Sequence, residues 1–343
     1  MTAASLGARI AASETAQPSR AEPEMLKRVD IQNFRCLSSV RAELRPLTVL
    51  IGENDTGKSA FIAALQTVFR GGKLPTTDHW RLDMSQAIKI IAWYGGVPFQ
   101  IERDPSDRHH YVVRGPKCDL ERQVETFELP STGPVMTAPG QKDKDPAPTL
   151  GAHGEAVPTL IDYLLRRDRE RFNAFVSALR GYVPGLLEVN VPTPDPATRR
   201  LDLRIDSGLE IPADRASVGV RLMLFFVALA YHPSPPNIIL LEEPENGVHP
   251  RRLADIMKLL RDITKGVHCG HPAQVILTTH SPYLLDHVNL DEDQVLVFRR
   301  NDDGSRSCDP VDRERLKAFL DDFMLGEVWF NEKEEGLIKK PGG

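Results

Sequence analysis

A phosphate-binding loop is the clearest chemical signal in this sequence. The segment VLIGENDTGKSAFIAAL, residues 49–65, matches the pattern G-x-x-x-x-G-K-[ST]. In this pattern backbone N–H groups converge on a β-phosphate at a helix N-terminus, the lysine lies between the β- and γ-phosphates, and the hydroxyl binds Mg²⁺. A chance match is the alternative for so short a pattern, but the apolar run before it and the helical pattern after it favour the loop. The predicted nucleotide contacts are Gly52, Glu53, Asn54, Asp55, Thr56, Gly57, Lys58, Ser59 and Ala60.

Two adjacent acids follow a second apolar run, in IILLEEPENGVHP at residues 238–250. Acids at the end of a buried strand suit metal coordination and the activation of water. We expect Glu243 to be the general base that orients the attacking water and Glu242 to lie in the outer shell of the metal. Acids at a strand end are often only surface residues, but the apolar residues before these two and the proline after them favour the functional interpretation.

A histidine follows a third apolar run, in VILTTHSP at residues 275–282. Here Thr278, Thr279 and His280 end a predicted strand, from which the imidazole could reach a γ-phosphate. A lone histidine is usually structural. This one comes third in an ordered series of strand tips, so we predict a catalytic role for His280.

The elements that must position these groups alternate between strands and helices. The first half predicts strands at 26–34 and 44–52, a helix over 59–70, and a meander of strands within 87–103 and 109–117. The second half predicts a buried parallel strand in 237–245, a helix over 249–266, and a strand, polar tip and helix over 273–288. A last strand at 294–300 and a last helix over 312–325 complete the pattern.

The region between these halves is less regular. Residues 130–158 are rich in proline and glycine and predict a mobile connector rather than a packed element. An amphipathic helical segment follows over 159–183, and its arginines are interleaved with acids, which favours a solvated charged face over a DNA contact. Short strand-like pieces occupy 189–211. The segment 218–232 is apolar nearly all round, so we expect a buried helix.

Composition excludes several classes of protein. The 343 residues carry a formal charge of −5, which gives no general reason for nucleic-acid binding. The four cysteines form no CxxC pair, which argues against a disulfide framework or a zinc site and suits a reducing cytoplasm. No apolar run is long enough for a membrane span. Residues 1–24 lack a continuous apolar stretch and predict a disordered tail rather than a secretory signal.

Together the three segments resemble ABC-type ATPase heads of the SMC/RecF/OLD class, in particular the stand-alone bacterial AAA-like ABC ATPases. The resemblance covers most of 26–300 and implies an α/β P-loop NTPase of ABC-ATPase type, with a mixed sheet core, an antiparallel β meander and a helical subdomain. It implies a head over 25–300 that includes a mobile linker (130–158) and a helical insertion (159–188), followed by a C-terminal helical tail over 301–343.

The resemblance also assigns residues. The arginine after N-F contacts the nucleotide in that group, so this role passes to Arg35. The segment DRASVGVRLMLFFVALAY resembles the signature segment that completes the ATP site of the opposite subunit, which implies that role for Ser217 and Gly219. A helix cap and a turn glycine are the plainer interpretation of these two, and both can hold together. Gln100 is the candidate metal-sensing glutamine, and Glu242 stands where an aspartate is usual.

The implied machine binds ATP and Mg²⁺ and forms a homodimer when ATP binds. About sixty residues follow His280, fewer than a TOPRIM nuclease domain needs, so the resemblance implies a separate effector, such as a TOPRIM-like protein in antiphage defence. One alternative is a RecF-like repair clamp that binds duplex DNA, for which Arg199, Arg200 and Arg204 form a local basic cluster. The other is an ATP-gated scaffold in which Glu242 slows hydrolysis.

Overall fold

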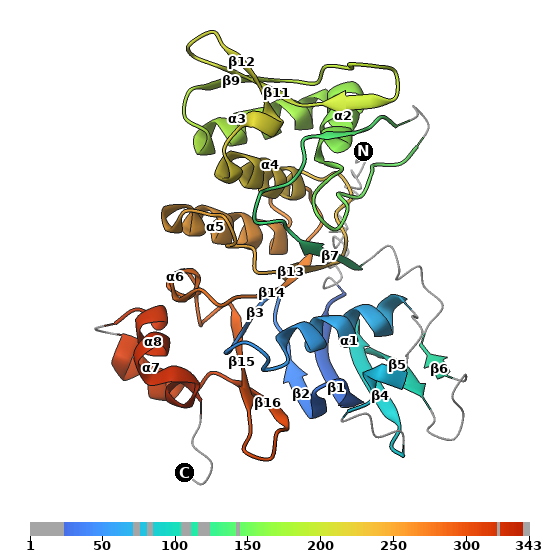
Figure 1. The fold of residues 1–343 in the computed structure, drawn as a ribbon, viewed down its shortest axis with the longest axis vertical. Helices are drawn as coiled ribbons and strands as arrows, with labels where there is room; N and C mark the ends of the chain where they lie inside the picture. Colours follow the sequence, from blue (N-terminus) through green and yellow to red (C-terminus); the bar gives the residue numbers. More distant parts are fainter. Residues whose placement is uncertain are drawn as a thin grey trace, which may run out of the picture.

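The fold is described from a computed structural model (Figure 1). The described residues are 24–70, 76–80, 85–103, 111–115, 124–141, 145–320 and 323–338. The predicted N-terminal tail therefore lies almost wholly outside the described residues. Among the described helices, none combines the length and the apolar character that a membrane span requires.

A central sheet of six strands, in the order β16-β15-β3-β14-β13-β7, positions the three chemical segments. All of its strands run parallel except β16, which is antiparallel to β15. The strands are β3 (Leu47–Ile51), β7 (Val124–Glu128), β13 (Ile238–Glu242), β14 (Gln274–Thr278), β15 (Gln294–Arg300) and β16 (Arg306–Pro310). Because carboxyl ends of parallel strands share one edge of a sheet, the residues that follow β3, β13 and β14 come together there.

Helix α1 and an antiparallel sheet cover one face of the central sheet. This second sheet has the order β2-β1-β4-β5-β6. Side chains from α1, from this sheet and from Leu50, Leu240 and Ile276 of the central strands form one buried apolar cluster. The elements are β1 (Leu26–Phe34), β2 (Leu37–Glu43), α1 (Lys58–Arg70), the short helix η1 (Thr76–Asp78), β4 (Ile88–Tyr94), β5 (Val97–Arg103) and β6 (Tyr111–Arg114).

The opposite face of the central sheet packs against helices. Val49, Leu241 and Val275 point to this side, as the alternation of side chains along a strand requires, and join a cluster with the helices α4 and α5. In Figure 1 these helices lie between the central sheet and an upper lobe of short strands and helices. The lobe and its supports are β8 (Thr137–Pro139), α2 (Val157–Arg167), α3 (Arg169–Tyr182), β9 (Leu186–Asn190), β10 (Thr198–Arg200), β11 (Asp202–Ile205), β12 (Glu210–Pro212), η4 (Ala213–Arg215), α4 (Val218–Ala230), η5 (Pro250–Arg252) and α5 (Leu253–Thr264).

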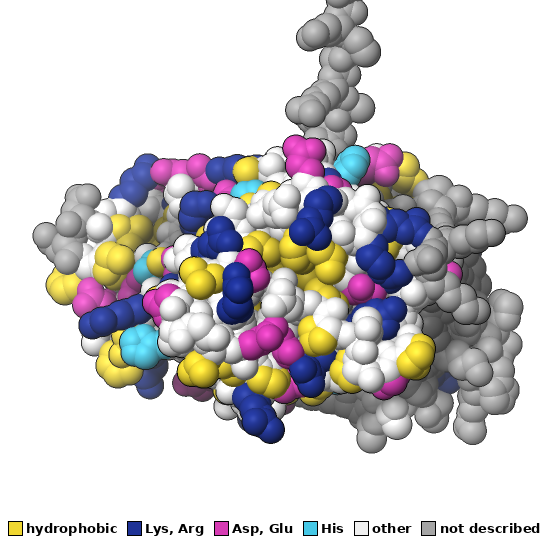
Figure 2. Space-filling view, turned by 90° about the horizontal axis from the view of Figure 1, so that it is seen from above, with side chains coloured by type: hydrophobic (Ala, Val, Ile, Leu, Met, Phe, Trp, Pro, Cys, Tyr) yellow, Lys and Arg dark blue, Asp and Glu magenta, His cyan; other side chains and the backbone are white. Residues whose placement is uncertain are grey.

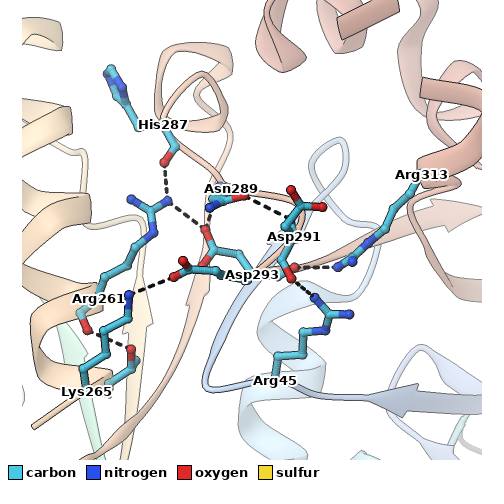
Figure 3. A network of polar contacts seen from close by, with 10 residues as sticks. Arg45, Arg261, Lys265, His287, Asn289, Asp291, Asp293 and Arg313 are labelled. Carbon is cyan, nitrogen blue, oxygen red and sulfur yellow. Dashed lines mark hydrogen bonds and ion pairs between the residues drawn. The ribbon is translucent and has the colours of Figure 1, made fainter. Parts of the chain in front are cut away.

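Three helices, α6 (Pro282–Leu285), α7 (Arg313–Leu320) and α8 (Leu325–Leu337), form a C-terminal group. A network of polar contacts joins this group to the head (Figure 3). The buried carboxylate of Asp293 accepts 2.7 Å and 2.8 Å hydrogen bonds from Arg261 of α5 and from the Asn289 backbone. The backbone of the same loop accepts hydrogen bonds from Arg45, before β3, and from Arg313 of α7. Loop 287–293 is thus held from several elements at once.

Several local expectations need correction. The sequence predicted one helical segment over 159–183, but Asp168 divides it, since its carboxylate accepts the Arg171 N–H and caps α3. The strand at 294–300 and the helix over 312–325 were expected to be the last of their kind. The structure adds β16 and α8, so the C-terminal tail is not purely helical, and β16 belongs to the central sheet.

The proline- and glycine-rich stretch 130–158 also differs from its prediction as an unpacked connector. Its strand β8 pairs with β10, and Met136 and Leu150 are almost fully buried in the core around α4. The described part of this stretch is therefore packed. Proline and glycine set its turns here, while the scattered apolar residues fix it to the lobe.

Candidate nucleotide-binding and hydrolysis site

The loop between β3 and α1 has the backbone of a phosphate cradle. Gly52, Asp55 and Gly57 have φ of 140°, 59° and 107°, which turn the chain sharply before the helix. A Cβ atom at Gly52 would lie 2.2 Å from the carbonyl oxygen of Phe298, so only glycine fits there. The hydroxyl of Thr56 closes the loop with a 2.8 Å hydrogen bond to the carbonyl of Glu53. The loop is thus shaped by its own backbone and by β15 beneath it.

Lys58 is folded back over this loop. Its ammonium donates hydrogen bonds of 2.8 Å and 2.9 Å to the carbonyls of Gly52 and Glu53. Burial lowers the pKa of Lys58 to about 8, although the nearby charges of Glu243, Glu334 and Glu245 act to raise it. The Lys58 ammonium, which we predicted to contact the β- and γ-phosphates, therefore lies at the loop, and the two carbonyl oxygens hold it there.

Ser59 meets the first acid of the second segment. Its hydroxyl hydrogen-bonds to Glu242, at the end of β13, and burial together with the charges of Glu128 and Glu243 raises the pKa of Glu242. In the parallel pairing of β13 with β7, Glu128 is the register partner of Glu242. These groups line a cleft of about 520 Å³, which is bounded by Ser59, Glu128, Leu129, Pro130, Ser131, His153, Glu242, Glu243 and Asn246.

Glu128 is a residue of this cleft that the sequence analysis missed. Gln100, the predicted metal-sensing residue, lies on β5 of the antiparallel sheet, and its amide donates a 2.7 Å hydrogen bond to Glu102. The structure therefore does not bring Gln100 to Ser59 and Glu242, and Glu128 lies beside Glu242 instead. Its strand reads VETFE, without the continuous apolar run that marked Glu242, so only the pairing of β7 with β13 reveals Glu128.

Glu243 and His280 face each other from the ends of two adjacent strands. His280 Nε2 lies 3.3 Å from Glu243 Oε1, and the ring is also hydrogen-bonded to the Gly52 backbone. Burial and the positive charge of Lys58 lower the pKa of His280, which favours the neutral imidazole. Glu243 has a left-handed backbone (φ 44°), and its N–H donates to the Thr278 carbonyl on the next strand. Such conformations gather at functional sites.

A third acid supports the histidine from behind. The Glu245 carboxylate accepts a 2.5 Å hydrogen bond from the Thr279 hydroxyl and a 3.1 Å hydrogen bond from the His280 N–H. Its other oxygen, Oε2, is buried and has no hydrogen-bond partner among the described residues, and burial raises the pKa of this carboxyl. Glu245 thus fixes the turn after β14 from which His280 projects.

Arg35 lies in a left-handed turn next to the cradle. Its guanidinium donates a 3.0 Å hydrogen bond to the Asp78 carboxylate, and its neighbour Cys36 packs against the position of Gly57. The side chain is about half exposed (45%). Asp78 therefore holds Arg35 close to the loop at which the sequence analysis placed it, while the guanidinium stays open on one side.

The proposed signature residues stand apart from these groups. The hydroxyl of Ser217 caps α4 by accepting a 3.4 Å hydrogen bond from Val220 N–H, and its side chain is exposed. A Cβ atom at Gly219 would meet nothing within 4 Å. Among the described residues, neither one hydrogen-bonds with residues 52–59. The N-terminus of α4 is thus capped but open.

The basic clusters considered for DNA are largely paired. Arg199, Arg200 and Arg204 form ion pairs with Asp162, Asp202 and Glu188. Figure 2, a view onto the upper lobe, shows basic and acidic side chains intermixed with apolar ones on this face. Among the described residues of this face, the pattern is that of a solvated mixed-charge surface rather than a continuous phosphate-binding track.

Comparisons with known proteins find similar ATPase domains. Residues 25–119 match the family described as "AAA ATPase domain", and residues 153–286 match "AAA domain, putative AbiEii toxin, Type IV TA system". The chain is 24% identical to the OLD nuclease of Thermus scotoductus over 379 aligned positions, which span 92% of this chain and 70% of that protein. In sequence and in fold the chain is therefore similar to ABC-like ATPase heads of the SMC/RecF/OLD type. Its architecture is the predicted α/β P-loop class, with a mixed sheet, antiparallel strands and helices.

Solved structures of SMC heads share this fold. An SMC head bound to the C-winged helix domain of ScpA aligns with a TM-score of 0.58 and 11% identity, over 86% of this chain and 99% of that one. The Thermotoga maritima SMC head aligns with a TM-score of 0.50 and 17% identity, over 84% and 99%. A third head, bound to a ScpA domain and derived from Pyrococcus furiosus, gives 0.57 and 10%, over 87% and 99%. At these identities the likeness establishes the fold.

Proposed function

We propose that this head binds and hydrolyses ATP, dimerises around it, and drives a DNA-processing or antiphage-defence complex through a separate effector. The observation that supports hydrolysis best is the Glu243–His280 pair, 3.3 Å apart at the tips of adjacent parallel strands and hydrogen-bonded to the phosphate loop at Gly52. A carboxylate and a neutral imidazole beside a phosphate cradle can orient a water and hold the terminal phosphate.

The catalytic roles follow from these positions. Glu243 accepts a proton from the attacking water, while His280, which the low pKa keeps neutral, hydrogen-bonds to a γ-phosphate oxygen. Lys58 exchanges its bonds to the Gly52 and Glu53 carbonyls for bonds to phosphate oxygens. The amide of Asn246 donates a 2.8 Å hydrogen bond to Glu243 Oε2 and limits its rotation.

The oxygen-rich cleft suits Mg²⁺. Magnesium prefers carboxylate and hydroxyl oxygens, and here Ser59 and Glu242 are hydrogen-bonded to each other with Glu128 beside them. These residues would hold the ion, and a bound Mg²⁺ would neutralise charge that develops on the phosphates. Burial and the charges of Glu128 and Glu243 raise the pKa of Glu242, and a bound cation would favour its charged form.

Dimerisation is proposed from the open N-terminus of α4. Backbone N–H groups at a helix N-terminus attract phosphate, and here Ser217 is exposed and a Cβ atom at Gly219 would meet no other atom within 4 Å. In a face-to-face dimer, each signature segment would complete the partner's cradle, so that ATP joins the two heads and its hydrolysis lets them part. The similar proteins support the proposal of a separate effector and of a DNA-processing role. Two of the similar heads were solved with a bound ScpA domain, and the similar Thermus scotoductus protein is a nuclease.

The decisive experiment compares steady-state ATP turnover of the wild-type chain and of Glu243→Gln, with and without linear duplex DNA. We expect Glu243→Gln to lower kcat at least 100-fold, the scale of general-base loss, while it still binds ATP. With ATP this variant should form a stable dimer, which light scattering measures. A variant that binds ATP and stays monomeric would contradict the dimer.

The same assay separates the alternatives. ATP turnover that is stimulated by duplex DNA would favour the repair clamp. The ion pairs of the arginines in the lobe argue against this alternative, because paired arginines are less available to phosphates. A burst without further turnover would favour the ATP-gated scaffold. Slow turnover that DNA does not change would point to a protein effector, and cleavage of the DNA itself would assign nuclease activity to this chain.

A further inference from the structure

We propose that Arg306, on β16, positions the phosphate loop and cancels the charge of Asp55 so that ATP can bind. This inference rests on the proposed ATP-binding function. Arg306 Nε donates a 2.7 Å hydrogen bond to the Asp55 carbonyl, and Nη2 donates a 2.9 Å hydrogen bond to the Asp55 carboxylate. The two residues are 251 positions apart in the sequence.

Asp55 is an unfavourable residue for a phosphate cradle. Its carboxylate lies in the middle of the loop, where a polyphosphate anion would approach, and two like charges repel each other. Its side chain is 78% exposed, whereas that of Arg306 is only 8% exposed. The cation is therefore buried and the acid faces solvent, so the ion pair can neutralise the acid while the guanidinium itself stays out of solvent.

The same contact holds the backbone. Asp55 has φ 59°, a left-handed conformation that a residue with a Cβ adopts only at an energetic cost. Arg306 bonds to both the carbonyl and the carboxylate of this residue, while its Nη1 donates a 2.6 Å hydrogen bond to the Gly304 carbonyl. Only a planar guanidinium offers donors in these three directions at once, so a lysine could supply the charge and not the geometry.

The strand that carries Arg306 is itself fixed to the cradle. β16 pairs with β15, and the Phe298 carbonyl on β15 closes against Gly52 at the start of the loop. In Figure 1 the β15–β16 hairpin lies beside β2, below the level of α1. The hairpin thus supports the loop at Gly52 and at Asp55, and it links the C-terminal segment to the nucleotide.

The test is a double-mutant cycle in the full chain. Arg306→Ala should raise the Kd and KM for ATP about tenfold, the effect expected for lost charge-assisted hydrogen bonds, with kcat changed less than about twofold. Asp55→Asn alone should bind ATP more tightly. Combining the two should restore the Kd to within about threefold of wild type, because the uncompensated charge is gone. Arg306→Lys should lie between wild type and Arg306→Ala.

A matched control lies on the same hairpin. Arg299 pairs with Asp309 at 2.7 Å across the two strands, and Arg299→Ala should leave the KM for ATP unaltered while thermal unfolding reports the loss of the pair.

If Asp55→Asn fails to restore binding to Arg306→Ala, or if Arg306→Ala binds ATP as well as wild type does, the proposal is overturned. Should Arg306→Ala not fold, Asp55→Asn and Arg306→Lys still decide it. A wild-type chain that binds no ATP would overturn the proposed function, and this inference with it.

Discussion

The N-termini of α1 and α4 are both helix ends that could hold a phosphate, and they are built in opposite ways. Before α1 the loop is closed: Lys58 bonds to two of its carbonyls and Arg306 holds Asp55. Before α4 the chain is open, with an exposed Ser217 and free space at Gly219. One end is organised within a single chain, whereas the other offers donors to something outside it.

This difference bears on the proposed dimer. A site that needs a second copy should bring one preformed half and one exposed half, because the exposed half has to reach another molecule's nucleotide. The two helix ends have these properties. The comparison can be tested by changing the two ends with equivalent substitutions.

Glycine substitutions should separate the two ends most strongly. Gly52→Ala puts a methyl group 2.2 Å from the Phe298 carbonyl at φ 140°, and we expect it to cost about 3 kcal/mol or more and to abolish ATP binding. Gly219→Ala, where no atom lies within 4 Å, should stabilise α4 slightly and lower turnover only in the dimer. Thermal unfolding and equilibrium ATP binding measure both. Equal effects of the two variants would remove the distinction.

Raising the pH should weaken ATP binding at the closed end. Burial lowers the pKa of Lys58 from 10.5 to about 8, so the destabilising charge is fully present below pH 8 and is relieved as the pH rises toward 10.5. The unliganded fold therefore gains stability over that window, while ATP, which needs the charged form, binds about tenfold more weakly at pH 9 than at pH 7. Titration calorimetry in two buffers at pH 8.5 should detect proton uptake on binding. Lys58→Arg should show none, and uptake in that variant would exclude Lys58 as its source.

The smallest effect is expected at the open end. The cap from Ser217 is long, 3.4 Å, and exposed, so Ser217→Ala should lower the free energy of unfolding by only about 0.5 kcal/mol. Denaturant unfolding measures this cost. If the hydroxyl also contacts the partner's nucleotide, turnover should fall by much more than so small a destabilisation accounts for. A fall in stability with no change in turnover would leave Ser217 as a cap alone.

Much of the fold could be predicted from the sequence because its signals are local. The apolar runs before Gly52, Glu242 and Thr279 are strands, and they end at one edge of the central sheet. The residues of the phosphate loop have fixed types and a fixed spacing, so a short stretch of sequence is enough to recognise the loop. The buried helix α4 was equally visible, since it is apolar on all sides.

The remaining parts depend on distant partners. The strand β16 reads RSCDP, which has no apolar alternation, and it forms only because β15 provides an edge. Arg306 and Glu128 belong to no motif, and their neighbours Asp55 and Glu242 lie far away in the chain. The sequence around Gln100 contains no sharp motif. Strand register, rather than a local pattern, brings Glu128 beside Glu242.

The position of β3 in the sheet has a consequence for how the chain folds. Its two neighbours are β14 and β15, and the adjacent buried bond from Leu26 N–H to Gln274 Oε1 spans 248 residues. On a ribosome, the antiparallel sheet of β1, β2, β4, β5 and β6 can pair as soon as it emerges, whereas β3 must wait for most of the chain. Such long sequence separation between contacts slows folding, and it leaves the unpaired edges of β3 exposed to aggregation during synthesis. The nucleotide cradle is therefore among the last parts of the molecule to form.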